Sequence, residues 1–342
     1  MGAIKGKIQT VLGVIEPGQL GVTQTHEHVF VDLLPEALRD ENVGDPITLE
    51  NIGYLRRHWL SNPANLVLNS EADAIAELKR FKNSGGDTIV ELTPNLNCRN
   101  PEGLVRVSRA TSVHIVMGTA FYNAAYHPPD IESMSEEDIA AVFVNDIMKG
   151  ADGTGIKAGI IGEIALDWPV HPNEAKVLRG GALAQAQTGA ALNIHPGRDA
   201  ESPLDAVRIV KEAGGDPART VMSHIDRTLF EIDDVLKLAD TGCYLEYDLF
   251  GQEASYYPLA DIDMPNDAAR VDYLIALIER GYRDKLLISL DVCHKTQLAR
   301  YGGEGYNHIL DNVLPLMRRK GMSDEDIDAI TVHNPARMLA FV

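Results

Sequence analysis

The feature that most constrains the fold of this chain is a regular alternation of short apolar runs with longer amphipathic stretches. Most of the apolar runs are nearly continuous in Val, Ile, Leu and Ala, as is typical of strands buried on both faces. They begin roughly 38 residues apart on average, about the length of one βαβ unit. The eight runs are residues 21–30, 87–93, 113–120, 158–167, 190–195, 220–226, 242–249 and 285–292.

Helical patterns fill several of the intervals between these runs. Ser135 opens the sequence Ser-Glu-Glu-Asp, which resembles a capping box at a helix start. The predicted helices are residues 71–83, 135–149, 203–213, 230–239 and 266–280. Eight strands alternating with helices predict a (β/α)8 TIM barrel, with residues 1–342 as a single domain. A doubly wound open sheet is the alternative, but no Gly-x-Gly-x-x-Gly follows the first run.

The two ends of the chain add smaller elements to the predicted barrel. Residues 8–22 predict a hairpin that turns at Glu16-Pro17-Gly18 and covers the N-terminal end of the barrel. Residues 309–320, 323–330 and 335–341 predict helices that close the chain.

Composition excludes several classes of function. There are 31 basic and 50 acidic residues, so the net charge of −19 argues against nucleic-acid binding and weakly against anionic membranes. No apolar run approaches the ~20 residues of a membrane span. The first 17 residues lack the apolar stretch of a signal peptide, and the three cysteines match neither a metal knuckle nor a disulfide framework. We therefore expect a cytoplasmic protein that acts on a small molecule.

Side chains that bind metals gather at the ends of the predicted strands, where a barrel builds its active site. The first run ends in Thr25-His26-Glu27-His28, and residues two apart in a strand point to the same side. Four imidazoles and two carboxylates come from five of the eight strand ends: His26, His28, Glu163, His195, His224 and Asp291. Any one of them alone could be structural, but their joint placement predicts a metal centre.

These ligand types favour two divalent transition metal ions over calcium or magnesium. Imidazoles and carboxylates suit zinc best here, with manganese, cobalt, nickel or iron as alternatives. One carboxylate can bridge two ions ~3.5–4 Å apart, and a water shared between them ionises near neutral pH to a hydroxide nucleophile. The sequence therefore predicts hydrolysis.

Three further residues are candidates for substrate binding. Tyr122 follows the third run and is predicted either to orient the substrate at the rim or to pack beneath a loop. Lys295 and Arg300 lie in the loop after Asp291, where specificity is commonly set. They are predicted either to hold a carboxylate or phosphate of the substrate or to form a solvated basic stretch.

The order of the ligands resembles that of the amidohydrolase superfamily. The sequence motifs around them resemble those of its phosphotriesterase family, including the lactonase-like relatives. The matching stretches are Gly21-Val-Thr-Gln-Thr-His-Glu-His28, Gly155-Ile-Lys-Ala-Gly-Ile-Ile-Gly-Glu163, Val221-Met-Ser-His224, Leu287-Ile-Ser-Leu-Asp291 and His333-Asn-Pro-Ala-Arg337. The resemblance runs from about residue 8 to the end of the chain and also implies a homodimer.

The resemblance assigns a role to each candidate ligand. It implies that His26, His28 and Asp291 hold the more buried ion and that His195 and His224 hold the more exposed one. It implies that Glu163 and a hydroxide bridge the two ions. The best-known members use a carboxylated lysine as the bridge instead, and that lysine aligns with Gly162 of this chain. Asp291 is expected to act as the general base and then the general acid.

The identity of the scissile bond remains open at this stage. The Glu-bridged branch implies a lactone or carboxylic ester as the substrate, with phosphotriesters or small amides as alternatives. Mononuclear deamination is disfavoured because His195-Pro-Gly-Arg-Asp lacks the proton-shuttling Glu of superfamily deaminases. A catalytically silent binding barrel is disfavoured because all six ligand positions are filled.

Overall fold

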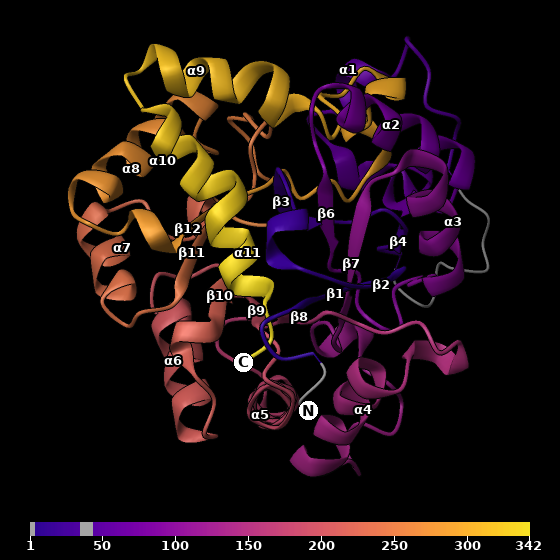
Figure 1. The fold of residues 1–342 in the computed structure, drawn as a ribbon. Coiled ribbons are helices and arrows are strands. Elements are labelled where there is room, and N and C mark those ends of the chain that lie inside the picture. Colours follow the sequence, from indigo (N-terminus) through magenta and orange to yellow (C-terminus); the bar gives the residue numbers. More distant parts are fainter. Residues whose placement is uncertain (1–3, 35–43) are drawn as a thin grey trace.

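The computed structural model describes residues 4–34 and 44–342, and it confirms the predicted barrel (Figure 1). One parallel sheet contains eight strands in the order β12-β11-β10-β9-β8-β7-β6-β3. Each strand lies within one of the predicted apolar runs. The strands are β3 (Thr23–Glu27), β6 (Thr88–Glu91), β7 (His114–Thr119), β8 (Ile160–Ala165), β9 (Leu192–His195), β10 (Thr220–Met222), β11 (Tyr244–Tyr247) and β12 (Leu286–Ile288).

The ring closes where the chain beyond β12 meets β3. The backbone N–H of Asp291 donates to the carbonyl of His26 over 3.2 Å, and the N–H of His28 donates to the carbonyl of Val292 over 3.2 Å. The carboxylate of Glu27 accepts from the backbone N–H groups of Leu290 and Val292, each over 2.9 Å. The His-x-His segment and Asp291 are therefore brought together by the same contacts that close the barrel.

Helices surround the barrel and follow the strands in sequence. Those of the outer layer are α2 (Glu71–Asn83), α3 (Pro101–Thr111), α4 (Glu136–Met148), α5 (Pro172–Thr188), α6 (Ser202–Glu212), α7 (Ile232–Ala239) and α8 (Asp267–Glu279). The predicted capping box at Ser135 is present, because its hydroxyl accepts from the N–H of Asp138. Helices α3 and α5 are the two that the sequence analysis did not anticipate.

The longest of these helices, α5, contains a pair of glycines that locally disfavour a helix. Packing explains them. A Cβ at Gly180 would lie 2.7 Å from Ile139 of α4, and a Cβ at Gly181 would lie 2.4 Å from Ile164 of β8. The glycines let α5 approach both neighbours closely, so tertiary contacts override the local preference.

The N-terminal hairpin is present, but the predicted turn at Glu16-Pro17-Gly18 is wrong. Strands β1 (Ile8–Thr10) and β2 (Gly13–Ile15) pair antiparallel and turn at residues 11–12. The Thr10 hydroxyl stabilises this turn by accepting from Leu12 N–H and donating to the carbonyl of Gly13. Pro17 instead begins a short 3-10 helix.

The C-terminal helices also form, and the last of them crosses the end of the barrel. They are α9 (Leu314–Arg319), α10 (Asp324–Asp328) and α11 (Asn334–Leu339), and α11 lies in front of the ring of strands in Figure 1. A small helix and a two-residue strand pair complete the elements, namely α1 (Ile52–Leu55), β4 (Val31–Asp32) and β5 (Val67–Leu68). None of the described helices is both long and apolar enough to cross a membrane.

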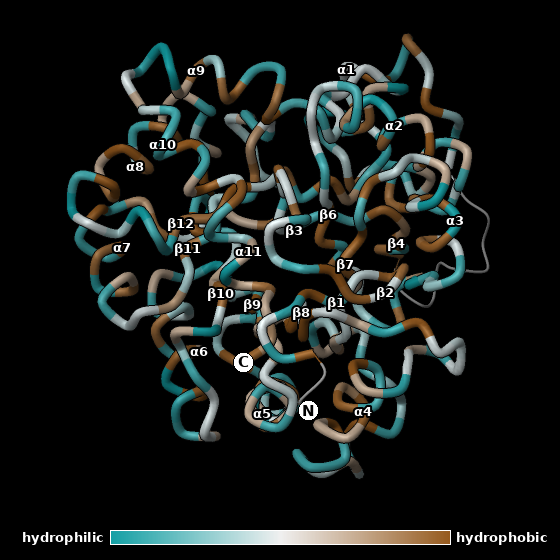
Figure 2. Tube along the Cα trace, viewed as in Figure 1, coloured by the Kyte–Doolittle hydropathy of each residue, from teal (hydrophilic) through white to brown (hydrophobic). Residues whose placement is uncertain are grey.

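The interior of the barrel is apolar at the end that α11 and the hairpin cover. Ile8, Leu20, Met338 and Leu339 are fully buried there against side chains from the strands. These strand residues are Val90, Leu92, Val116, Ile160, Ala191, Val221, Tyr244 and Leu287. Figure 2 shows hydrophobic residues along the strands and hydrophilic ones on the outer turns of the helices. The opposite end of the barrel is left for polar groups.

Candidate metal centre and active site

All six predicted ligands lie at one end of the barrel, at or just beyond the carboxyl ends of their strands. His26 belongs to β3, Glu163 to β8 and His195 ends β9. His224 and Asp291 follow β10 and β12 by two and three residues. Parallel strands bring their carboxyl ends to the same rim, so the fold assembles residues that are up to 265 positions apart in sequence.

A register shift places Glu163 among the imidazoles. The pairing of β8 with β9 is irregular between Ile161 and Ile164. Strict alternation from the inward-facing Ile160 would turn Gly162 inward and Glu163 outward. The extra residue reverses this, and the Glu163 carboxylate faces the barrel interior, where its side chain is only 3% exposed.

Glu163 lies at the centre of the cluster. Its Oε1 is 3.3 Å from Nε2 of His28, and its Oε2 is 3.5 Å from Nε2 of His26. The same Oε2 is 2.9 Å from Nδ1 of His195 and 3.6 Å from Nε2 of His224. One carboxylate therefore contacts all four imidazoles, as the predicted bridging position requires.

Asp291 completes the side of the cluster that contains the His-x-His pair. Its Oδ1 lies 3.2 Å from Nε2 of His28 and 3.8 Å from Nε2 of His26. Asp291 and His224 both have left-handed backbones, with φ of +50° and +54°. Such a conformation costs roughly 1–2 kcal/mol for a residue with a Cβ, and strain of this kind concentrates at functional sites.

A second layer of groups orients the imidazoles. Asp248, one residue beyond β11, lies 3.1 Å from Nδ1 of His26 and 2.9 Å from Nδ1 of His224. The hydroxyl of Thr93 lies 2.9 Å from Nδ1 of His28. These contacts hold the Nε2 atoms of all three rings toward Glu163. In sequence, an acid just beyond a strand, such as Asp248, is equally compatible with a purely structural role.

Glu246 of β11 has such a structural role. Its Oε2 accepts from the Ser223 hydroxyl over 2.7 Å and from the Asn193 amide over 2.9 Å. It lies farther from the rings than Asp248 does, at 3.5 Å from Nδ1 of His26.

The acidic and basic members of the cluster shift each other's pKa values in opposite directions. Burial acts to raise the pKa of Glu163, but His26 and His195 outweigh it and hold this pKa well below its usual range. Burial acts to lower the pKa of His28, but Asp291 and Glu163 raise it to about 10. Because an imidazole binds a metal in its neutral form, an ion bound here has to displace a proton.

The residues present fit a binuclear metal site. Nε2 of His26 is fully buried and has no hydrogen-bond partner among the described residues. Ligand atoms of His26, His28 and Glu163 lie within 4.8 Å of one another, and so do those of Glu163, His195 and His224. Two groups of nitrogen and carboxylate donors that share one carboxylate are the donor chemistry of a divalent transition metal pair.

Comparison with known proteins agrees with this arrangement. The sequence profile of the phosphotriesterase family matches residues 6–339. The chain belongs to the phosphotriesterase family. It is 43% identical to the N-acetyltaurine hydrolase of Homo sapiens over the whole of both chains. This phosphotriesterase-family chain is a hydrolase, as the sequence predicted, and its predicted homodimer and cytoplasmic location stay predictions.

Two solved structures resemble this family member along nearly their whole length. A resiniferatoxin-binding protein from Rhodobacter sphaeroides matches with a TM-score of 0.92 and 34% identity, covering 98% of this chain and 96% of that one. The organophosphorus hydrolase from Deinococcus radiodurans matches with a TM-score of 0.79 and 27% identity, covering 98% of each chain. Their names describe different ligands, so the fold alone does not identify the substrate of this chain.

Of the three predicted substrate-binding residues, the structure brings one to the metal centre. The hydroxyl of Tyr122 lies 3.5 Å from Nδ1 of His195. Burial raises the pKa of Tyr122 well above its usual value, and Glu163 raises it further, so the phenol stays a hydrogen-bond donor. Tyr122 is placed to contact a substrate at the centre.

Lys295 and Arg300 lie elsewhere. Arg300 forms an ion pair with Asp73 of α2, and its backbone N–H donates to the Glu77 carboxylate. Asp73 is also the charge that acts on Lys295. The loop after Asp291 runs outward onto α2, so the structure does not bring these two cations to the metal centre.

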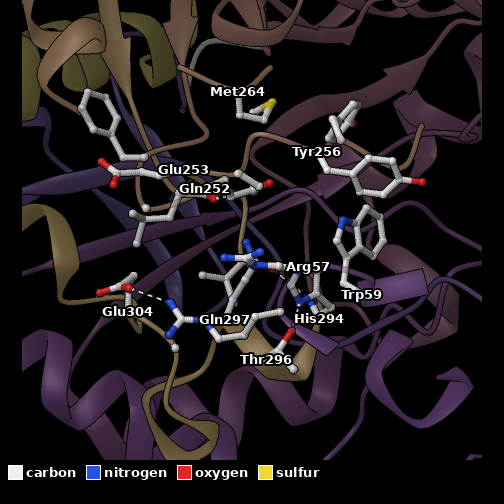
Figure 3. Close-up of a pocket in the computed structure, with 18 of the residues that line it drawn as sticks. Arg57, Trp59, Gln252, Glu253, Tyr256, Met264, His294, Thr296, Gln297 and Glu304 are labelled. Carbon is white, nitrogen blue, oxygen red and sulfur yellow. Dashed lines mark hydrogen bonds and ion pairs between the residues drawn. The ribbon is translucent and has the colours of Figure 1, made fainter. Parts of the chain in front are cut away.

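A cavity of about 600 Å³ opens beside the segment after β12 that carries Asp291 (Figure 3). Leu290 and Val292, the neighbours of Asp291, form part of its wall. Figure 3 shows Arg57 near the middle, with Trp59 and Tyr256 on one side and with Glu253 and Glu304 on the other. Its volume is within the range of about 300–1,000 Å³ that is typical of small-molecule binding sites.

One charged residue near the centre was missed by the sequence analysis. Arg198 follows His195 by three residues, and its Nε and Nη2 atoms each lie 3.4 Å from the hydroxyl of Tyr257. Tyr257 also lines the cavity. Its position just after a strand-end histidine is the sequence signal that could have identified it.

Proposed function

We propose that this chain is a binuclear metal-dependent amidohydrolase that removes a short acyl group from a small N-acyl amine, with N-acetyltaurine as the reference substrate. The observation that carries the proposal is the 43% identity to human N-acetyltaurine hydrolase along the whole of both chains. The proposal takes the amide alternative in place of the lactone or carboxylic ester that the sequence favoured. Both bonds present an acyl carbon to the same nucleophile.

The metal centre would be held by the residues that the sequence singled out. His26, His28 and Asp291 would hold one ion, His195 and His224 a second, and Glu163 would bridge them. Zinc is the first expectation, with manganese, cobalt, nickel or iron compatible with the same donors. Two such ions supply a polarised acyl oxygen and a bound water of lowered pKa.

Asp291 supplies the proton transfer that an amide requires. An amine is a poor leaving group until its nitrogen is protonated, so the site needs a group that takes a proton and returns it. The Asp291 side chain is 15% exposed, the most of the six ligands, so it can reach both water and the substrate nitrogen. Glu27 holds the backbone on both sides of it. Tyr122 supplies a hydrogen-bond donor beside His195.

A pair of isosteric substrates tests the proposal. N-acetyltaurine and its ester counterpart, O-acetylisethionate, differ only in the amide nitrogen that replaces the ester oxygen. Metal-loaded protein is assayed for acetate release from each, together with a panel of lactones and a phosphotriester. We expect release from N-acetyltaurine that is abolished by a chelator and restored when metal is added back.

The other outcomes are equally informative. Metal-dependent hydrolysis of the ester and lactones without the amide would overturn the proposal and support the lactonase prediction. Phosphotriester hydrolysis alone would instead support the phosphotriesterase alternative. Measurement of bound metal per chain in the same samples separates an inactive site from an unloaded one.

A further inference from the structure

Arg198 is a partly buried cation without an acidic partner. Among residues 4–34 and 44–342, no carboxylate lies within 4.0 Å of its guanidinium. Its contacts are with Tyr257, whose hydroxyl is 3.4 Å away and whose ring centroid is 5.7 Å away. Burial acts to lower the pKa of Arg198, but Tyr257, Tyr122 and Asp167 outweigh it, so the group stays charged.

Other buried arginines of this chain are satisfied internally. Arg270 pairs with Asp226 over 2.7 Å and with Asp267 over 2.9 Å. Arg99 pairs with Asp146 over 2.9 Å. Arg198 differs from both, because the only hydrogen bonds of its guanidinium to the described residues are the two 3.4 Å contacts with the Tyr257 hydroxyl, which leaves donors for an anion from outside the chain.

Arg227 is close enough to Arg198 for the two charges to act on each other, and its hydrogen bonds are made within the chain. It donates to the carbonyl of Pro196 over 3.1 Å and to the Thr228 hydroxyl over 3.2 Å. Its positive charge adds to that of Arg198, and no described acid neutralises either one within ion-pair distance. Two cationic side chains therefore lie close enough to act on each other and on Tyr122 and His195 of the cluster.

The position of Arg198 relates it to the substrate rather than to the metal ions. It lies just after His195, and its charge acts on Tyr122, which contacts that imidazole. Tyr257 joins it to the cavity beside Asp291. A substrate whose acyl group is at the metal centre would therefore extend its amine half past Tyr122 toward Arg198.

We propose that Arg198, supported by Tyr257, binds an anionic group on the amine half of the substrate. This inference rests on the proposed amidohydrolase function, and it defines the substrate class as N-acyl amines that carry a sulfonate or a carboxylate. A guanidinium presents several donors in a fixed plane, and these match the oxygens of such anions. Arg198 takes the role that the sequence analysis had given to Lys295 and Arg300.

Matched substrates isolate the contribution of the charge. N-acetyltaurine is compared with its neutral methyl sulfone analogue, which has nearly the same shape. We expect Arg198→Gln to reduce the preference in kcat/KM for the anionic substrate by about 10- to 100-fold, mainly through KM. Arg198→Lys should retain part of the preference, and Tyr257→Phe should reduce it by less than Arg198→Gln.

Two further arginine variants sharpen the result. Arg208→Gln is the control, since this exposed residue of α6 pairs with Asp205 and Glu212. Arg300→Gln tests the earlier prediction directly. An unchanged preference in both Arg198 variants, or a loss in Arg300→Gln instead, would overturn the inference while leaving the amidase function intact.

A binding measurement keeps the inference testable without turnover. Ethanesulfonate is titrated calorimetrically into metal-loaded wild type and into the Arg198 variants, whose folding is checked by thermal unfolding. We expect wild type to bind it and Arg198→Gln to bind it at least 10-fold more weakly. Equal binding contradicts the inference even if no amide is ever cleaved, so the two proposals fail separately.

Discussion

The two ends of the barrel are built from the same strands but from opposite kinds of side chain. We call the apolar end that α11 and the hairpin cover the closed end, and the end that holds the candidate ligands the mouth. On β8, Ile160 faces the closed end and Glu163 faces the mouth. On β10, Val221 faces the closed end, and His224 follows at the mouth. The closed end is satisfied by apolar burial alone, whereas the mouth buries ionisable groups that are costly to desolvate unless they contact one another or a metal.

This difference teaches that stability and chemistry are separable in this molecule. The closed end contributes free energy of folding through apolar side chains, none of which is a candidate ligand. The mouth contributes chemistry, holds its groups in place through hydrogen bonds and carries the backbone strain of His224 and Asp291. Each of the following experiments changes one end and asks whether the other responds.

The largest effect is expected from Asp291→Asn at the mouth. Loss of the group that moves the proton should lower kcat for the preferred substrate by about 10²–10⁴-fold, while the closed end keeps the barrel folded. Steady-state kinetics, bound metal and thermal unfolding are measured together. Asp328→Asn, in the exposed α10, serves as the control. Near-normal kcat with metals bound would remove Asp291 from the catalytic step.

The converse change is Leu339→Ala at the closed end. Leu339 is fully buried against the strand interiors, and truncating such a residue costs about 2–5 kcal/mol of unfolding free energy. We expect kcat/KM to stay near the wild-type value at temperatures where the variant is folded. Urea unfolding and kinetics on the same preparation check this. A parallel fall in activity would mean that the two ends are coupled.

Much of this difference between the two ends could be predicted from the sequence, because the order of apolar and polar residues along each strand reflects it. Continuous apolar runs identified all eight strands, and ligands at their ends identified the mouth. The sequence pattern was less informative where tertiary packing or a side-chain hydrogen bond overrides the local preference for a helix or a turn. Gly180 and Gly181 obscured α5, and the Glu16-Pro17-Gly18 turn was wrong because Thr10 stabilises an earlier one.

The site was predicted more fully than its surroundings. The positions of the six ligands follow from strand ends, although strict alternation from Ile160 would have turned Glu163 outward. The family resemblance added the bridging role of Glu163. The loop after Asp291 was misleading because sequence does not show that Glu77 draws it onto α2. Arg198 and Tyr257 are close only in the folded chain, since 59 positions separate them.

A more moderate effect is expected when the orientation of the imidazoles is disturbed. In Asp248→Asn the amide replaces one of the oxygens that face His26 and His224, so one ring loses its acceptor. We expect metal affinity to fall about 10- to 100-fold, as measured by competition with a chelator. Asp146→Asn is the matched control, since this acid is also buried but pairs with Arg99 and accepts from the Thr119 hydroxyl. Equal losses in both variants would indicate a general effect of charge instead of orientation.

The remaining prediction concerns pH, which should act on the mouth and not on the apolar end. Burial lowers the pKa of His294 to about 3, even though Asp291 opposes this, and the ring is stacked on Trp59 with centroids 4.9 Å apart. The unfolded chain binds a proton there below about pH 6.5 and the folded chain does not. The contribution of His294 to stability is therefore complete above pH 6.5 and is lost as the pH falls toward 3, by up to about tenfold in the folding constant per pH unit.

The variant His294→Gln isolates this contribution, because glutamine does not titrate. We expect its free energy of unfolding to fall less steeply than that of wild type between pH 6.5 and 4, while the two curves run parallel above pH 7. Urea unfolding at a series of pH values measures both. Leu339→Ala provides the contrast, since its loss of stability should be the same at every pH if the closed end is held by apolar contacts alone. If the free energy of unfolding falls equally steeply below pH 6.5 in wild type and in His294→Gln, the fall in stability arises instead from the other ionisable groups of the mouth.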